Sequence, residues 1–392
     1  MEHSSKIYIT SLHMKHGGVE MAIASLASAL AEKGFTVEIL CTYRLGEPAY
    51  PIHPAVKLTY LTEDTPNREQ FRDAVCRRNP LRIFREGFRA LGILRRKKQT
   101  MNRALRSIQE GTVISTRNEH SLLLSRYGAP GVKKIAQLHN DHGFDARLIR
   151  DFQHGYGNID YFVLLTEQTR HEVAGFLKGH NSKIVCLTIP NFIAPPPPDL
   201  SAEKSKQIIA AGRLHPDKDF SSLLRIWSMV SPKHPDWTLK IAGEGALEHS
   251  LKDQARDLGI ADQVLLTGTL PHDQLLREMA RSACYALTSV AESFGLVLVE
   301  AMSCGTPPVA FDVRVGPRAI IENGKDGFLI PNRDETRFAE HLALLMDDPA
   351  LQARMGAQAR RRAQFFYKDT VMESWLSLLS AGRGVNSQGD AI

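Results

Sequence analysis

Short apolar runs alternate with segments of helical periodicity along the first half of the chain. Residues 6–10 form a β-rich run, and residues 19–33 carry apolar positions at helical spacing after a glycine pair. A second apolar run follows at 36–41, so the order is strand, glycine turn, helix, strand, which opens a parallel α/β sheet. Further strands are predicted at residues 112–115, 134–138 and 161–166.

A run of four prolines, residues 195–198, interrupts the pattern near the middle of the chain. Polyproline cannot continue a helix or a central strand, so residues 191–200 are predicted to be a hinge. The alternation then restarts. The sequence therefore predicts an α/β protein with two Rossmann-like, doubly wound domains that face each other across a cleft. The predicted strands of the second half are residues 207–211, 238–242, 264–267, 284–289 and 306–311.

Domain boundaries follow from these patterns and from the length of 392 residues, which exceeds the roughly 250–300 residues at which one core stops growing. We expect an N-terminal domain at 1–190 and a C-terminal domain at 201–366. Closing helices are predicted at 335–366 and 369–379; the last of them, within 367–381, should return to the first domain, with Trp375 as its anchor. Residues 382–392 should be disordered.

The sequence also bears on compartment and on metals. No apolar run approaches the roughly 20 residues that span a bilayer, and the first residues lack a signal-peptide pattern. We expect a cytoplasmic protein, and a peripheral location at the inner face of the plasma membrane is the alternative. The five cysteines are widely spaced without metal-ligand spacing, so free thiols and no structural zinc are expected.

The most informative segment is AESFGLVLVEAMSCGTPP, residues 291–308. It follows a predicted strand and places Glu292 before a turn, Phe294-Gly295-Leu296, that opens a helix carrying Glu300. The free amides of a helix start and its positive dipole end suit a pyrophosphate. Glu292 could then receive hydroxyls of an attached sugar.

This spacing, Glu-x7-Glu with its flanking text, resembles the signature of the retaining GT-B glycosyltransferases of family GT4, also known as glycosyl transferases group 1. A second match is Gly212-Arg213-Leu214-His215-Pro216-Asp217-Lys218. The resemblance implies that Arg213 and Lys218 hold the diphosphate of a nucleotide sugar, for which a guanidinium fork and an ammonium are suited. The family's glycine after the lysine is Asp219 here.

The resemblance also implies donor contacts at smaller motifs. In the second half these are the turns at Gly243 and Gly268. In the first half they are the Gly17-Gly18 loop, which approaches the diphosphate and the sugar, and His139, the family's cleft histidine. Segment 115–119 is a candidate acceptor contact. Each turn could instead serve only to reverse the chain. The predicted catalytic set is Glu292, His139, Arg213 and Lys218; the predicted donor-binding set is Gly17, Gly18, Arg213, Lys218, Gly243, Gly268, Phe294, Gly295, Leu296 and Glu300.

The implied function is retaining transfer of a hexose from a nucleotide sugar, commonly a UDP-sugar, to a glycan, lipid-linked or cell-envelope acceptor. Asp217-Lys218-Asp219 formally reads as a metal-binding DxD, but the lysine between the carboxylates argues against that. We expect no metal, no cofactor beyond the donor substrate and no nucleic-acid partner. The alternatives are an epimerase or phosphorylase on the same fold, or a sugar-nucleotide binder without catalysis.

Residues 68–98 hold eleven basic residues against three acidic ones, an excess of +8 that outweighs the +6 of the whole chain. Apolar positions recur there at helical spacing beside arginines, which predicts a basic amphipathic helix. One interpretation is that it binds an anionic membrane surface. The other is that its apolar stripe packs on the N-terminal sheet. The stripe consists of Leu81, Phe84, Phe88, Leu91 and Leu94.

Overall fold

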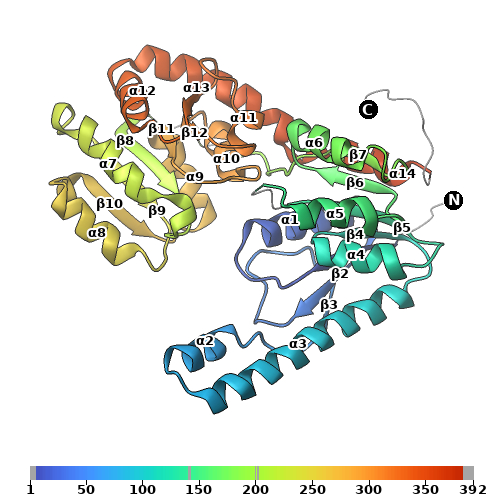
Figure 1. The fold of residues 1–392 in the computed structure, drawn as a ribbon. Coiled ribbons are helices and arrows are strands. Elements are labelled where there is room, and N and C mark those ends of the chain that lie inside the picture. The colour runs from blue at the N-terminus through green and yellow to red at the C-terminus, as the bar shows by residue number, and fades with distance from the viewer. Residues whose placement is uncertain (1–5, 140–142, 199, 201–202, 383–392) are drawn as a thin grey trace.

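The first domain is built on a seven-stranded parallel sheet of order β3-β2-β1-β4-β5-β6-β7 (Figure 1). The computed structural model describes residues 6–139, 143–198, 200 and 203–382. Buried aliphatic side chains on both faces of the sheet form two cores beneath the helices, as a parallel sheet requires. The strands are β1 Lys6–Ser11, β2 Thr36–Tyr43, β3 Lys57–Thr62, β4 Thr112–Ser115, β5 Lys133–Gln137, β6 Tyr161–Leu164 and β7 Val185–Thr188; the helices beside them are α1 Gly18–Glu32, α4 Asn118–Tyr127, α5 Ala146–Arg150, η1 Asp151–Gly155 and α6 Glu167–Leu177.

The second domain repeats this plan with a six-stranded parallel sheet of order β10-β9-β8-β11-β12-β13. Cores lie on both of its faces as well. The predicted architecture of two Rossmann-like domains is therefore confirmed. The strands are β8 Ser205–Ala211, β9 Thr238–Ala242, β10 Val264–Gly268, β11 Ser282–Leu287, β12 Pro308–Asp312 and β13 Phe328–Pro331; the helices are α7 Phe220–Val230, α8 Glu248–Asp257, α9 His272–Arg281, α10 Leu296–Ser303, α11 Gly316–Ile320, α12 Glu335–Asp347 and α13 Pro349–Ala363.

The structure differs from the sequence prediction at several elements. Strands β3, β7 and β13 were not predicted; β3 and β7 are half-buried edge strands with mixed apolar and polar residues, so they lack a strong pattern. The single helix predicted for residues 335–366 is wrong. It is divided between α12 and α13, because Asp348 caps the second helix by accepting a hydrogen bond from the Leu351 amide at 2.8 Å and Pro349 opens it.

The last helix, α14 Lys368–Ser380, lies beside β6 and β7 of the first domain (Figure 1). Its Trp375 is 1% exposed and belongs to a core cluster with Val163 and Ile189. The carbonyls at its C-terminal end, including that of Leu378 at 2.5 Å, accept hydrogen bonds from the Lys133 ammonium. The end of the chain thus fastens onto the first domain. The predicted disordered tail, apart from Gly382, lies outside the described residues.

Helices α2 Arg68–Cys76 and α3 Pro80–Ser107 form a hairpin at the lower edge of the first domain, and its free end extends beyond the body of that domain (Figure 1). The buried face of α3 consists of Glu86, Ile93, Met101 and Leu105. The apolar stripe lies on a different face. The exposed fractions of its side chains are 83% for Leu81, 68% for Phe84, 61% for Phe88, 54% for Leu91 and 57% for Leu94. The interpretation that this stripe packs on the sheet is therefore wrong. Within the described ranges, no helix combines the length and apolar character needed to cross a membrane.

Candidate active site

The glycine loop of the first domain leads from the carboxyl end of β1 into α1. The Gly17 amide donates a hydrogen bond to the Tyr50 hydroxyl at 3.2 Å. A Cβ atom at Gly17 would lie 2.1 Å from Oε2 of Glu20, a buried side chain. Since Glu20 is itself held by Arg117, whose guanidinium donates to its Oε1 at 3.2 Å, the loop accommodates no side chain there. The loop backbone is thereby fixed at the carboxyl edge of the sheet.

His139 follows the end of β5 at the same edge. It is buried, and neither ring nitrogen has a hydrogen-bond partner among the described residues. Burial, aided by the charge of Arg117, lowers the pKa of His139 to about 4, so the ring is neutral at neutral pH. A buried imidazole with two open positions can exchange hydrogen bonds with a polar ligand.

Three turns meet at the carboxyl edge of the second sheet. The Gly243 amide donates to the Gly268 carbonyl at 2.8 Å, and the Gly212 amide donates to the Ala242 carbonyl at 2.9 Å. A Cβ atom at Gly243, whose φ is +143°, would lie 1.9 Å from the Gly212 carbonyl oxygen. Glycine is therefore needed for the turns after β8 and β9 to pack together.

The two motifs of the second domain come together through an ion pair. The Lys218 ammonium contacts Oε1 of Glu292, which also accepts a hydrogen bond from the Ser289 hydroxyl at 2.9 Å. The Val290 amide donates to the Asp217 carbonyl at 2.8 Å, so the backbones are joined as well. Arg213 lies in the same loop with an exposed guanidinium. A cation pair and a carboxylate thus share one edge of the sheet.

Asp219 occupies the position at which the family has glycine, and it adopts the left-handed backbone with φ 46° and ψ 49°. Aspartate tolerates this region better than most residues. Its carboxylate caps α7 by accepting from the Ser222 amide at 3.2 Å and pairs with Arg333 at 2.5 Å. These contacts offset the backbone strain at Asp219. The turn therefore has the left-handed conformation that favours glycine, although aspartate replaces glycine there.

Helix α10 begins directly after the loop that carries Glu292. Gly295 adopts φ +97° as its cap, and its carbonyl accepts a hydrogen bond from the Leu298 amide at 2.9 Å. The amides that precede Leu298 at a helix start have no partner within the helix. The Phe294 side chain is buried, with its ring 5.6 Å from that of Phe366, and Leu296 packs partly against the same core. Both side chains thus anchor the turn, so these two residues would contact a ligand through their backbone groups.

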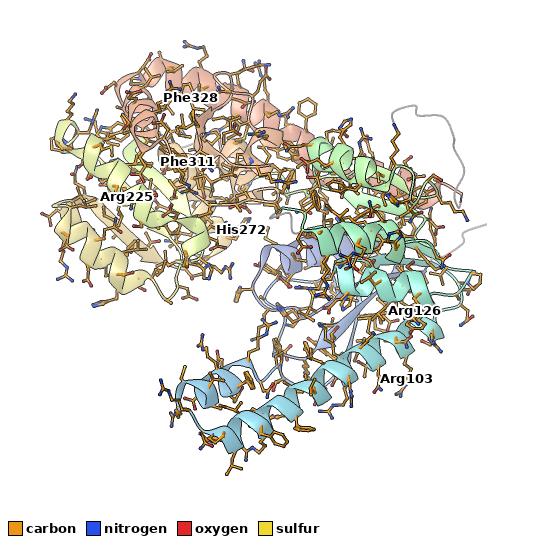
Figure 2. All side chains as sticks on the ribbon, in the orientation of Figure 1. Arg103, Arg126, Arg225, His272, Phe311 and Phe328 are labelled. Atoms are coloured by element: carbon orange, nitrogen blue, oxygen red, sulfur yellow. The ribbon has the colours of Figure 1, made fainter. Side chains whose placement is uncertain are left out.

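Glu300 lies one turn into α10 and is buried. Burial raises the pKa of its carboxyl to about 7. The His272 ring lies beside it, with Nδ1 4.0 Å from Oε1 of Glu300; Figure 2 labels His272 at the side of the second domain that faces the first. A carboxyl whose pKa is raised toward neutral pH by burial is typical of a functional site.

Tyr50 of the first domain lies within electrostatic range of two charged residues of the second domain. Burial is the main cause that raises the pKa of its hydroxyl, and the hydrogen bond from Gly17 lowers it; Glu300 and Arg213 of the second domain also act on it electrostatically. The carboxyl edges of the two sheets therefore face each other. The predicted residues lie on these two edges, Gly17, Gly18 and His139 on one and the rest on the other.

Sequence reasoning missed Tyr50. It placed Glu20 at the end of the glycine loop without a role of its own, and it named Arg117 only as part of a candidate acceptor segment. Nothing around Tyr50 forms a motif, since it comes from the loop after β2. For Glu20 the signal was available: an acidic residue in the first turn of α1, beside the glycine pair, that is buried against Arg117. The described residues contain no group of three or more His, Cys, Asp or Glu arranged to hold a metal ion.

Comparison with known proteins matches residues 196–362 to the family Glycosyl transferases group 1. An exopolysaccharide phosphotransferase of Streptomyces coelicolor is 29% identical over 93% of this chain, but the chain spans only 39% of that protein. The amylovoran biosynthesis glycosyltransferase AmsD of Erwinia amylovora is 23% identical, with 93% of this chain and 96% of that protein covered.

Among solved structures, a mutant of TarM from Staphylococcus aureus, in complex with fondaparinux, α-GlcNAc-glycerol and UDP, superimposes with a TM-score of 0.75 at 16% identity. The match covers 96% of this chain and 100% of that one. This likeness establishes the fold. Residues 196–362 therefore form a glycosyl transferases group 1 domain, which lies within a two-domain GT-B fold of the kind found in glycosyltransferases.

Proposed function

We propose that this chain is a retaining glycosyltransferase that takes its sugar from a nucleotide-sugar donor, a UDP-sugar, without a metal. The observation that carries the proposal is the contact between Lys218 and Glu292 at the start of α10. Two motifs 74 residues apart thereby supply a phosphate-binding cation and a sugar-binding carboxylate at one point. A nucleotide sugar offers the matching groups, because its diphosphate is negatively charged and its sugar carries hydroxyl donors.

The proposed reaction depends on stabilising a departing diphosphate. Arg213, Lys218 and the amides at the start of α10 would hold its negative charge, and such electrostatic stabilisation is usually the largest contribution to catalysis. Without donor, Glu292 neutralises Lys218. A bound diphosphate would draw the ammonium away and leave the Glu292 carboxylate to accept sugar hydroxyls. We prefer front-face attack, in which the acceptor hydroxyl passes its proton to the departing phosphate.

The first domain would complete the site around the transferred sugar. His139 is neutral, and neither ring nitrogen has a partner within the part of the chain that the structure describes, so the ring can both donate to and accept from sugar hydroxyls. The backbone at Gly17 and Gly18 would approach the diphosphate. Glu300 would accept hydrogen bonds from the ribose.

For the acceptor we propose a glycan or lipid-linked molecule of the cell envelope. The names of the Streptomyces and Erwinia relatives refer to exopolysaccharide and to amylovoran biosynthesis, and the TarM structure contains UDP.

We also propose that residues 68–98 bind an anionic membrane surface, because the exposed apolar stripe of α3 runs beside arginines. Salt-sensitive co-sedimentation with anionic but not neutral liposomes tests this; equal binding to both would contradict it.

A screen of nucleotide sugars tests the proposed reaction. The chain is incubated with UDP-sugars and GDP-mannose, first alone and then with candidate acceptors, and the released diphosphate is measured. Slow release from one donor, accelerated by acceptor, is expected. Interconversion of donors without release would identify an epimerase. Phosphate-dependent release of a sugar phosphate would identify a phosphorylase, and binding without turnover a non-catalytic binder.

A further inference from the structure

A pocket of about 650 Å³ lies in the first domain between α3, α4 and the segment after η1. Its volume is within the range of small-molecule sites. None of its lining residues belongs to the donor motifs, the glycine loop or His139. The pocket shares Leu94, Lys97 and Lys98 with the hairpin segment and Glu119 with the candidate acceptor segment, but the donor site leaves it without a role.

The pocket has an apolar floor that continues onto the protein surface. Met101 of α3 and Leu123 of α4 are buried within the floor, and Leu122 also lines it. Leu94 lines the pocket as well, although 57% of it is exposed, since it is the last residue of the apolar stripe of α3. Leu94 therefore joins the exposed apolar stripe to the lining of the pocket.

Uncompensated positive charge surrounds this floor. The Lys97 ammonium is neutralised by Glu119 at 2.5 Å. Lys98 and Arg126 also line the pocket, and neither has a carboxylate partner among the residues that the structure describes. Arg126 instead lies over the Tyr127 ring at 5.3 Å. Two positive charges beside an apolar cavity are suited to an anion that carries an alkyl chain.

We propose that this pocket binds one molecule of a lipid phosphate, with the phosphate between Lys98 and Arg126 and the adjoining alkyl chain on the floor formed by Met101 and Leu123. A phosphate monoester carries about −1.5 to −2 charges near neutral pH, which matches the two cations better than a carboxylate does. The pocket would thereby hold a single membrane lipid beside the hairpin. This site is separate from the donor site, so its occupancy is measured without any nucleotide sugar.

Titration calorimetry with monomeric decyl phosphate, below its micelle concentration, tests the proposal on the full chain. Saturable binding of one molecule is expected. Decanoate should bind several-fold more weakly, and hexyl phosphate at least tenfold more weakly, because each buried CH₂ contributes to affinity. Inorganic phosphate binding as tightly as decyl phosphate would make the pocket a plain anion site and overturn the proposal. Equal binding of the neutral amphiphile octyl glucoside, or no saturable binding, would also overturn it.

Charge-neutralising variants locate the site. Lys98→Gln and Arg126→Gln should each weaken decyl phosphate binding about tenfold, as expected for loss of one charge-assisted contact. Arg103→Gln is the matched control, because Arg103 is an exposed cation of α3 outside the pocket; Figure 2 labels Arg103 on α3 and Arg126 on α4. Equal weakening in all three variants would indicate general electrostatic attraction and contradict the assignment. Both test residues are on the surface, and circular dichroism verifies that the variants fold.

Discussion

Glu300 offers a prediction in which stability and function change in opposite directions. Burial raises the pKa of its carboxyl from 4.5 to about 7. In the folded chain the group therefore holds its proton more strongly than in the unfolded chain. Its contribution to stability is greatest below about pH 4.5 and is lost as the pH rises through about 7. At about 1.4 kcal/mol per pKa unit, the loss amounts to about 3 kcal/mol.

Glu300→Gln removes this ionisation while keeping the shape. Near pH 5 the variant should be about as stable as the parent chain, whereas at pH 8 it should be more stable by up to about 3 kcal/mol. For a domain of this size that raises the melting temperature by several degrees. The same change should raise the donor KM roughly tenfold, with kcat less affected, because an amide replaces the carboxylate that would accept ribose hydroxyls.

Calorimetric melting from pH 5 to pH 8 measures the first effect, and Glu340→Gln is the matched control. Glu340 is an exposed glutamate of α12, so its replacement should leave the pH profile unchanged. Parallel stability profiles for the parent chain and Glu300→Gln would refute the claim that an uncompensated carboxylate is buried at this site. A gain in stability without any change in donor KM would leave the buried charge in place and refute its role in binding.

Further predictions concern the other residues of the site and the core. Lys218→Ala and Arg213→Ala should each slow transfer by roughly two orders of magnitude with unchanged melting; a full-speed Lys218→Ala enzyme would disprove the phosphate assignment. Glu292→Gln should lower kcat more than it raises the donor KM, which steady-state kinetics can distinguish. Activity should persist in EDTA, and dependence on added Mn²⁺ would contradict the metal-free proposal. Trp375→Ala should destabilise the first domain by about 3–5 kcal/mol in chemical denaturation.

Strong local patterns explain why most of the fold was predictable from the sequence. The central strands β1, β4, β8 and β9 are short apolar runs followed by glycine or polar turns, and their predicted ranges differ from the observed ones by at most two residues. The division between α12 and α13 depends on one aspartate cap and one proline. Edge strands have one neighbour and half-buried faces, so their sequences carry a weaker signal.

The site was predictable where it is contiguous in sequence and unpredictable where it depends on tertiary contacts. Glu292 and Lys218 each stand in a recognisable segment, but their contact follows from the packing of β8 against β11. Tyr50 reaches Gly17 across 33 residues with no motif around it. The exposure of the α3 stripe was also undecided, because periodicity identifies an apolar face without showing what covers it.

The stereochemistry of donor hydrolysis tests the central claim most directly. The chain is incubated in EDTA with the nucleotide sugar that supports diphosphate release, and the anomer formed first is followed by proton NMR before mutarotation. The account predicts that an α-linked donor gives the α-sugar together with the nucleoside diphosphate, and that Lys218→Ala forms neither at a comparable rate. A β-sugar as the first product, or release that is unaffected in Lys218→Ala, would contradict it.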